Sequence, residues 1–560
     1  MQPEFDAVIV GAGPAGSACA ITLARNGLNV LMLEKAKIPG EKNVTGGVLY
    51  GNFIPPYGLT DLIPEFEKEA PLERKIMKHE IYVVSTDKKG ELTKYYRMTK
   101  SSLWSKLGLA KIPSESGHDY TVLRRKFDRW FSLKAVEAGA MLSTQSTVTD
   151  LIIEQGRVAG VSTQRGDVIS RVVVDCSGVT SNLLEKAGLR ERLKPEDLYH
   201  GIKRVYKLDS STIEKRFGLN QGEGSAIFLM GDFMYGIHGG AFVYTNYDTL
   251  SVGIVASMTS MIEATTTRFN DIGKLLDAQD RLESTSLVGS MIDGAQLVEY
   301  SAHNIPKGYR TMLSTPYTDG FLVAGDALGT FVKVGSLIDG MRRAIASGIM
   351  AAETIMHAYR QNSFDKKVLS LYKQSLAPIY RDINYSRRDS IMSESFLAYR
   401  LFPKLVISFG KGVQKEKNQY KQNANLDAIQ RVQSGTGLLT YDEDKYYSHI
   451  KVNTDLCSKS VLKPWVPACP MNCYTIFSKK GVFASYRDLF LHNLSSLGSK
   501  AGDKGYQLAM RETFKDIAES ELRFDHVACV ACGTCGVIGP EEMVTFTHEL
   551  DGHGVRYRYG

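Results

Sequence analysis

The N-terminal segment alternates short apolar runs with glycines and polar positions. Residues 7–10 are apolar and rich in β-branched side chains, as a buried parallel strand requires. Residues 17–25 form an Ala-rich segment that predicts a helix, and Gly27 is suited to end this helix as its C′ glycine. Residues 29–33 are apolar after Asn29 and predict a second strand. The pattern therefore predicts a strand–helix–strand unit.

Glycines occupy the turn between the first strand and the helix, in the pattern Gly11-x-Gly13-x-x-Gly16. Gly11 permits a tight turn, Gly13 lets the backbone approach a pyrophosphate, and Gly16 lets the helix pack closely on the strand. The helix N-terminus offers N–H groups and the positive end of its dipole to phosphates. Glu34 ends the second strand and can accept a hydrogen bond from a ribose hydroxyl. These features predict dinucleotide binding, but they do not distinguish NAD from FAD.

Two later segments repeat the arrangement of an apolar strand followed by a turn of small residues. Residues 171–179 end in a turn at Gly178, and residues 321–324 lead directly into Gly325 and Asp326. Asp326 is well placed to bind the ribityl or pyrophosphate region of a flavin dinucleotide. A loop with glycines at positions 40, 46, 47 and 51 is typical of backbone lying close to a flat ring. Together with the first glycine turn, the turns at Gly178 and Gly325 make three that each follow an apolar strand. Three such turns favour FAD over NAD.

The middle of the chain has a different pattern. Residues 200–310 alternate aromatic and β-branched side chains with polar ones, which predicts an antiparallel sheet on the substrate side. Residues 148–154 and 158–163 predict a hairpin. Residues 364–430 read as helices, and part of this region combines apolar aromatic side chains with lysines. That combination suits a segment at a membrane interface, whereas the alternative is a helix pair packed on the flavin domain.

Composition and charge exclude several classes of protein. The 560 residues are 43% apolar and 23% charged, as is ordinary for a globular protein. The net charge is +7 without any run of five basic residues, so nucleic-acid binding has little support. No apolar run is long enough to span a membrane, and the N-terminus leaves no room for a signal peptide. We expect a cytoplasmic protein, peripherally associated with the inner face of the cell membrane.

The cysteines are unevenly placed, which in a reducing compartment suggests metal ligation rather than disulfides. Cys529, Cys532 and Cys535 are spaced C-x2-C-x2-C, as around one corner of an iron–sulfur cube. Cys469 lies in an earlier Cys-Pro pair and completes a ligand set for one [4Fe–4S] cluster. Zinc is the main rival, although zinc sites usually show paired C-x2-C knuckles. Cys473 is an alternative to Cys469 as the fourth ligand; the remaining cysteines, read as buried thiols, are Cys19, Cys176 and Cys457.

Several stretches together resemble electron-transfer-flavoprotein:quinone oxidoreductases in their Fix-type two-subunit form. GEKNVTGGVLY, TVLRRKFDRW, FVYTNYDTLSVGIV and YTDGFLVAGDALG resemble the flavoprotein subunit, over about residues 1–430. CPMNCY, ACVACGTC and GHGVRYRYG resemble the small ferredoxin-like subunit, over about residues 440–560. The two subunits are thus expected to be fused. The chain departs from the family pattern at Met471-Asn472-Cys473 and in a longer insertion at 486–523.

The resemblance implies an electron relay. A partner electron transfer flavoprotein, built from α and β subunits, delivers electrons singly to the cluster, and FAD collects two for a membrane quinone. The partner in some such systems bifurcates electrons, so a higher-order complex is also expected. Electron transfer through cofactors demands no nucleophile–base pair, and we predict no catalytic side chain. The alternatives are an FAD-dependent lipid or isoprenoid reductase of the geranylgeranyl reductase type, fed by the cluster, and a non-catalytic scaffold subunit.

The predicted fold is α/β, with a Rossmann-like FAD-binding domain, an inserted β-rich quinone- or substrate-side domain and a C-terminal ferredoxin-like α+β iron–sulfur domain. The FAD-binding domain is expected to be discontinuous, over residues 1–100, 121–200 and 311–360. The β-rich domain is expected over residues 101–120 and 201–310. A helical region follows over 361–433, and the cysteine-rich domain covers 440–560. The residues predicted to bind FAD are Gly11, Gly13, Pro14, Ala15, Gly16, Glu34, Lys35, Asn43, Gly46, Gly47, Arg124, Gly178, Gly325, Asp326 and Gly335. The candidates for quinone or membrane contact are Trp104, Phe396, Phe402 and Phe409.

Overall fold

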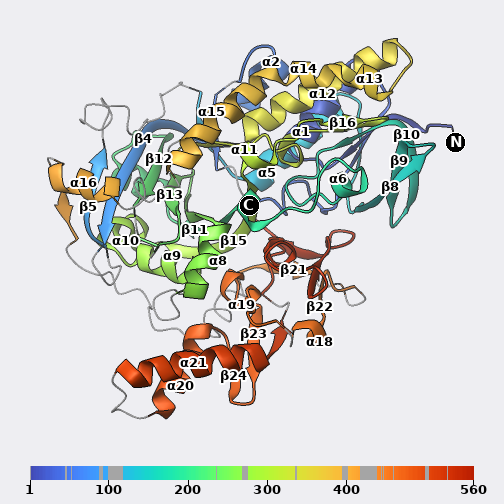
Figure 1. Cartoon of the computed structure of the whole chain (residues 1–560). Helices are drawn as coiled ribbons and strands as arrows, with labels where there is room; N and C mark the ends of the chain where they lie inside the picture. Colours follow the sequence, from blue (N-terminus) through green and yellow to red (C-terminus); the bar gives the residue numbers. More distant parts are fainter. Residues whose placement is uncertain are drawn as a thin grey trace.

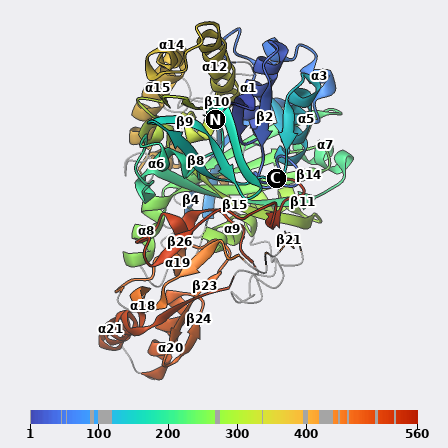
Figure 2. The ribbon, with the colours of Figure 1, turned by 90° about the vertical axis from the view of Figure 1, so that its right-hand side faces the viewer.

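The computed structural model describes residues 2–44, 47–51, 53–86, 92–98, 118–231, 233–234, 236–267, 275–334, 337–393, 401–410, 412–416, 438–442, 444, 447–457, 460–497, 503–525 and 528–560. Four predicted site residues lie outside these ranges: Gly46, Trp104, Gly335 and Phe396. Two parts, each built on one sheet, lie side by side, and the cysteine-rich C-terminal part lies beneath them (Figures 1 and 2). The last residue lies between the two sheet-centred parts rather than at the periphery.

The first sheet has the order β16-β17-β10-β1-β2-β7, with β9 pairing β10 and β8 pairing β9. Its core is parallel, since β1 pairs in parallel with both β2 and β10. Helices α1 (Pro14–Arg25), α5 (Arg124–Glu137) and α12 (Met341–Arg360) pack together against this part, which confirms the predicted strand–helix–strand unit. The strands are β1 (Phe5–Val10), β2 (Val30–Leu33), β7 (Met141–Ser143), β8 (Val148–Glu154), β9 (Arg157–Thr163), β10 (Gly166–Asp175), β16 (Tyr317–Thr318) and β17 (Phe321–Val323).

The second sheet has the order β15-β11-β14-β13-β12-β4-β5-β20, and β3 and β6 join it beside β4. Its segment from β11 to β15 is antiparallel, as the alternation over 200–310 predicted. The strands are β3 (Val48–Leu49), β4 (Leu72–Thr86), β5 (Leu92–Met98), β6 (Tyr120–Val122), β11 (Leu198–Lys207), β12 (Glu223–Met230), β13 (Gly239–Thr245), β14 (Thr249–Ser257), β15 (Gln296–Pro306) and β20 (Gln414–Lys415).

One boundary differs from the prediction. We placed residues 1–100 with the FAD-binding domain, but β4 and β5 lie in the second sheet, where β4 pairs in parallel with β12. The chain therefore crosses to the second sheet before residue 72 and returns through β6 and α5. Pairing between β4 and β12 joins residues about 150 positions apart along the chain, as the Lys75–Glu223 pair illustrates, so no local pattern announces it.

Shorter helices cover the second sheet and connect the two parts. Helices α8 and α9 pack on β14, and α16 packs on β4 and β5. Among the described residues, no helix is both long and apolar enough to cross a membrane. The remaining helices outside the cysteine-rich part, on both sheets, are α2 (Leu59–Leu62), α3 (Phe66–Glu69), α6 (Leu183–Lys186), α7 (Ser210–Phe217), α8 (Met258–Thr267), α9 (Leu275–Glu283), α10 (Ser286–Ile292), α11 (Gly308–Thr311), α13 (Lys366–Leu369), α14 (Leu371–Ser375), α15 (Ala377–Ser393) and α16 (Phe402–Phe409).

The cysteine-rich part combines small sheets with helices. Strands β23 (Tyr474–Ser478), β24 (Gly481–Phe483) and β25 (Glu521–Phe524) form one sheet, β22 (Ile450–Val452) pairs β26 (Val544–Phe546), and β21 (Thr440–Asp442) pairs β27 (Gly554–Arg556). The predicted insertion contains two helices, α20 (Tyr486–Ser496) and α21 (Asp503–Glu519), at the far end of this part. The short helices α18 (Thr454–Cys457) and α19 (Trp465–Ala468) complete it. Its ferredoxin-like topology stays a prediction.

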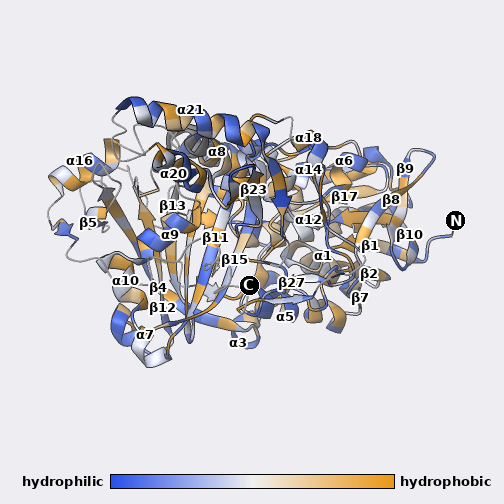
Figure 3. Cartoon of the chain, turned by 90° about the horizontal axis from the view of Figure 1, so that it is seen from below, coloured by the Kyte–Doolittle hydropathy of each residue, from blue (hydrophilic) through white to orange (hydrophobic). Residues whose placement is uncertain are grey.

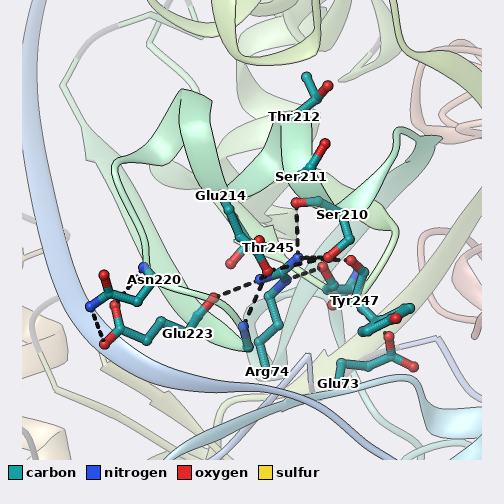
Figure 4. A network of polar contacts seen from close by, with 12 residues as sticks. Glu73, Arg74, Ser210, Ser211, Thr212, Glu214, Asn220, Glu223, Thr245 and Tyr247 are labelled. Carbon is teal, nitrogen blue, oxygen red and sulfur yellow. Dashed lines mark hydrogen bonds and ion pairs between the residues drawn. The ribbon is translucent and has the colours of Figure 1, made fainter.

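A buried arginine joins the start of β4 to the turns around it (Figure 4). The side chain of Arg74 is 1% exposed, and each of its three guanidinium nitrogens donates hydrogen bonds. A buried charge is tolerated only when its donors are satisfied in this way. The acceptors are Asn246 O, Glu214 Oε1, Glu223 O, Ser210 Oγ and Tyr247 O, at 2.7–2.9 Å.

Arg74→Met is expected to destabilise the protein by about 3–5 kcal/mol, because it leaves the Glu214 carboxylate and several carbonyls without their donor. Thermal unfolding followed by circular dichroism would show a lower Tm. The matched control is Arg165→Met, in an exposed turn between β9 and β10. Equal melting temperatures for the two variants would contradict the structural role of Arg74.

Candidate functional site

The turn between β1 and α1 is closed by contacts that only glycine permits. Gly11 has φ +99°, and a Cβ added there would lie 2.6 Å from Cys176 O. A Cβ at Gly16 would lie 1.9 Å from Gly11 O, so helix and strand touch backbone to backbone. Gly13 caps α1 and Pro14 is its first residue, a position where the missing N–H costs nothing. The N-terminus of α1 therefore points at the carboxyl ends of the parallel strands.

Glu34 follows β2 and faces this turn. Its Oε2 accepts from Ala12 N and its Oε1 from Ala36 N, both at 2.9 Å. Burial raises the pKa of Glu34, while these two backbone hydrogen bonds act in the opposite direction. The carboxyl group is thus held rigidly beside the glycine turn, where a ribose hydroxyl is predicted to bind.

A large cavity of about 190 Å³ opens at the carboxyl ends of β1, β2, β10 and β17. In open parallel sheets, ligands bind at this edge. Of the predicted FAD residues, Gly16 lies beneath the turn and Gly47 packs against the ring of Tyr244, so neither lines the cavity. Those that line it are Gly11, Gly13, Pro14, Ala15, Glu34, Lys35, Asn43, Arg124, Gly178, Gly325 and Asp326.

Asp326 gives the cavity an unused acceptor. Its Oδ1 is buried and has no hydrogen-bond partner among the described residues. Burial raises the pKa of Asp326, and the nearby Arg124 lowers it. A buried carboxylate oxygen without a donor is costly, and a hydroxyl of a bound ribityl chain would satisfy it. The side chain of Arg124 is held by Asp128: Nε donates to Oδ1 at 2.9 Å and Nη2 donates to Oδ2 at 2.7 Å. The residues present therefore fit a flavin dinucleotide.

Residues that sequence reasoning missed also line the large cavity. His548 comes from the cysteine-rich part, and its Nδ1 lies 3.2 Å from Lys35 Nζ. His303 comes from β15 of the second sheet. Cys176, predicted to be only a small buried hydrophobe, lines the cavity as well. Of these three positions, only Cys176 lies in a pattern that the sequence displays, the strand and turn at 171–179. The two histidines reach the cavity through long-range packing that the sequence does not display.

A second cavity, the cysteine cavity, lies in the C-terminal part. It is lined by Cys469, Cys473, Cys529, Cys532 and Cys535, together with Tyr474 and Trp465. The structure therefore brings the four predicted ligands together, with Cys473 beside them. Cys457 is buried elsewhere, with its Sγ 3.7 Å from Met543 O, and Cys19 is buried in α1. The two readings of the fourth ligand stay open, since Cys469 and Cys473 both line the cavity.

Backbone N–H groups donate to two of the thiols in the cysteine cavity, whereas burial raises the pKa of Cys532 and Cys535. Cys473 N donates to Cys469 Sγ at 3.3 Å, and Ala531 N donates to Cys529 Sγ at 3.4 Å. Contact with Cys473 and His449 lowers the pKa of Cys529 to about 6 against the effect of burial. Ala531 and Gly533 have positive φ angles, 49° and 79°, which curl the loop around the cavity.

These observations fit an iron–sulfur cluster held by the loop. Within the described ranges, however, no group of three or more His, Cys, Asp or Glu side chains is placed to hold a single metal ion. The cluster and its ligand set therefore remain predictions.

A polar bridge connects the two cavities. Thr534 Oγ1 lies 2.9 Å from His200 Nδ1 and donates to Asn304 Oδ1 at 2.8 Å. Thr534 also accepts from Cys532 Sγ at 3.3 Å. On the other side, a Cβ at Gly533 would lie 2.9 Å from Thr180, which lines the large cavity. The cavities thus share a wall where Thr180 and β15 of the large cavity meet Gly533 and Thr534 of the cysteine cavity. Strand β11 packs behind this wall through His200.

The membrane candidates are only partly described. Phe402 is half-buried against β4, whereas Phe409 is 72% exposed on α16. Leu401 and Leu405 are exposed with it, beside exposed Lys404. The opposite face of α16 packs through Val406 on the second sheet. As Figure 3 shows, α16 lies at the outer edge of the molecule and carries both hydrophobic and hydrophilic positions.

Gly11→Ala is expected to lose most of the bound FAD, because the added Cβ meets Cys176 O and the positive φ is strained. The ratio of flavin to protein absorbance after purification measures the loss. Gly27→Ala is the matched control, since Gly27 also has a positive φ, at the end of α1, but open space around it. If both variants retained FAD equally, the glycine turn would not be the cofactor site.

Comparisons with known proteins agree with this geometry. Residues 6–206 match the family described as FAD dependent oxidoreductase. Protein FixC of Escherichia coli (strain K12) is 39% identical over 373 residues, which cover 66% of this chain and 81% of that protein. Protein FixC of Bradyrhizobium diazoefficiens is 34% identical over 451 residues, covering 78% of this chain and 97% of that protein.

A solved structure shares the fold. It is a geranylgeranyl bacteriochlorophyll reductase-like protein from Thermoplasma acidophilum, 21% identical, with a TM-score of 0.53 and coverage of 70% of this chain and 89% of that chain. The family match and the cavity agree on FAD as the cofactor, and the resemblance to the flavoprotein subunit is confirmed. This chain belongs to the FixC family of FAD-dependent oxidoreductases, flavoproteins of the electron-transfer-flavoprotein:quinone oxidoreductase type.

Proposed function

We propose that this protein relays electrons from an electron transfer flavoprotein, through a [4Fe–4S] cluster and FAD, to a membrane quinone. The observation that carries the proposal is the shared wall between the cysteine cavity and the large cavity. FAD and a [4Fe–4S] cluster, when bound, would supply two-electron and one-electron chemistry respectively. Adjacent sites of these two kinds are what coupling a single-electron carrier to a two-electron acceptor requires.

The residues of the chain have separate tasks in this relay. The glycine turn, Glu34 and Asp326 bind the dinucleotide and fix it at the edge of the first sheet. Cys469, Cys529, Cys532 and Cys535 hold the cluster, and Thr534 keeps their loop against β11 and β15. The side chains between the two sites, His200, Asn304 and Thr534, are buried, so they would keep water out of the region between a bound cluster and FAD.

Access to a membrane quinone requires contact with the bilayer surface. The exposed apolar side chains of α16 beside Lys404 support peripheral binding, since such a face can enter the interface while the lysine meets lipid headgroups. These side chains support the proposal that the protein binds peripherally at the inner face of the cell membrane. Partner flavoprotein subunits, including a bifurcating pair in a higher-order complex, belong to the same proposal.

Anaerobic reduction followed by addition of a quinone analogue tests the relay. We expect electron paramagnetic resonance to detect one reduced [4Fe–4S] cluster, and optical spectra to show an FAD that the quinone reoxidises. A flavin that quinone leaves reduced would overturn the relay and favour the reductase of lipid or isoprenoid double bonds. Zinc in place of iron would overturn the cluster assignment. Absence of any flavin reduction would favour a scaffold subunit.

Two serine variants decide the fourth ligand. Cys469→Ser is expected to lose the cluster, measured as iron per protein and as the resonance signal. Cys473→Ser is expected to retain both, because Cys473 then only donates to the ligand Cys469 through its backbone N–H. The reverse outcome would assign Cys473 as the ligand. If both variants kept the cluster, the fourth ligand would be neither Cys469 nor Cys473.

A further inference from the structure

One cation of the large cavity forms no ion pair with the residues that the structure describes. Lys35 lies just after β2, is half-buried and lines this cavity. The other lysine and arginine side chains described at the cavity are paired: Lys42 Nζ lies 3.6 Å from Glu549, and Arg124 Nη2 lies 2.7 Å from Asp128. A cation that lines a cavity without a carboxylate partner favours an anionic ligand.

The polar contact that the structure gives Lys35 is with a neutral histidine of the cysteine-rich part. His548 Nε2 lies 3.0 Å from Thr180 O, which can only accept, so Nε2 carries a hydrogen. Burial and then the charge of Lys35 lower the pKa of His548 to about 3, so its other ring nitrogen carries none. Nδ1 therefore accepts a hydrogen bond from Lys35 Nζ at 3.2 Å. The imidazole orients the lysine and adds no charge of its own.

The backbone around His548 is fixed to the wall of the large cavity. Thr147 lines this cavity, and its Oγ1 donates to Glu549 O at 3.3 Å and accepts from Asp551 N at 3.3 Å. On the other side, the rings of His548 and Phe546 meet edge to face with centroids 6.0 Å apart, and Phe546 lines the cysteine cavity. The imidazole is thus held between the two cavities by contacts on both sides.

A neutral partner suits a lysine that binds an anion. A carboxylate in place of His548 would cancel the charge of Lys35, whereas the imidazole directs the flexible side chain and leaves its charge available. Burial lowers the pKa of Lys35, and the Glu549 carboxylate acts in the opposite direction. An anion bound in the cavity would act in the same direction as Glu549 and keep Lys35 protonated. An ammonium group has three N–H donors, and His548 takes one of them.

We propose that His548 positions the Lys35 ammonium group to bind the diphosphate of FAD. The diphosphate carries the permanent negative charge of this dinucleotide, and its oxygens accept from the two N–H groups that His548 leaves free. His548 is a positioning residue, because it acts on the cofactor through Lys35. The lysine comes from the first sheet and the histidine from the cysteine-rich part. No bond is made or broken, and the proposal depends on FAD binding but not on the electron relay.

The Kd of FAD tests this role in the full-length holoprotein, measured from the fluorescence of FAD released on serial dilution. Lys35→Met is expected to raise the Kd about 10- to 100-fold, the range of a charge-assisted hydrogen bond. His548→Phe keeps a ring but neither nitrogen, and it is expected to raise the Kd about 3- to 10-fold. Because His548 acts through Lys35, adding His548→Phe to Lys35→Met is expected to raise the Kd no further. His492→Phe, exposed on α20, is the matched control and is expected to leave the Kd unchanged.

The double variant separates positioning from packing. If His548→Phe raised the Kd by the same factor with and without Lys35→Met, His548 would act by packing and the proposal would be wrong. An unchanged Kd in either single variant would also overturn it. His548→Gln keeps an acceptor for Lys35 and a donor for Thr180 O, so it is expected to bind FAD more tightly than His548→Phe. Equal Kd values for these two variants would contradict the role of the hydrogen bond.

Circular dichroism confirms that each variant is folded, and His548→Leu takes the place of the phenylalanine variant if that one is not. The measurement contains neither quinone nor a partner protein. Failure of the electron relay would therefore leave these Kd values unaffected, and a wrong role for His548 would leave the relay unaffected.

Discussion

The close approach of backbone to backbone around α1 is the constraint on which the rest of the structure depends. A Cβ at Gly16 would lie 1.9 Å from Gly11 O, and a Cβ at Gly348 of α12 would lie 2.2 Å from Ala15 O. Helix α1 is therefore pressed between β1 and α12 at distances that no other side chain allows. Its N-terminus stays at the strand ends for this reason, and Ala12 N stays within reach of Glu34. Every other wall of the large cavity is built against this fixed edge.

The cysteine-rich part supplies residues to the lining of that cavity and is not a separate appendage. His548 lines the large cavity, and Lys37 pairs with Asp442 in β21. Further on, the Glu299 carboxylate in β15 accepts from the three backbone N–H groups of residues 558–560. These three hydrogen bonds hold the last residues of the chain against β15. Because residues far apart in the chain form the FAD cavity together, cofactor binding and docking of the cysteine-rich part stabilise each other.

The local parts of this architecture could be predicted from the sequence, and the long-range parts could not. The glycine turn, Glu34 and Asp326 were identified because each follows an apolar strand within a few residues. The cysteine spacing was likewise visible within seven positions, from Cys529 to Cys535. By contrast, β4 was assigned to the wrong sheet, and His548 and His200 gave no signal. Their partners lie on other elements, so their neighbourhood is decided by sheet pairing and packing that only the whole fold specifies.

Two of the residues brought together by long-range packing, His200 and His303, lie between the two cavities and determine the charge there. Burial lowers the pKa of His200 to about 4, so this histidine remains neutral at ordinary pH. His303, next to it on the cavity side of β15, is also held neutral, because burial and then Lys35 and Arg124 lower its pKa to about 3. These two histidines therefore contribute polar contacts to the wall but no charge. A proton gained there would place a positive charge between the two cavities and change the electrostatic potential in each of them. With both histidines neutral, Thr534 holds the loop of residues 532–535 against β11 and β15 through polar contacts that add no charge there.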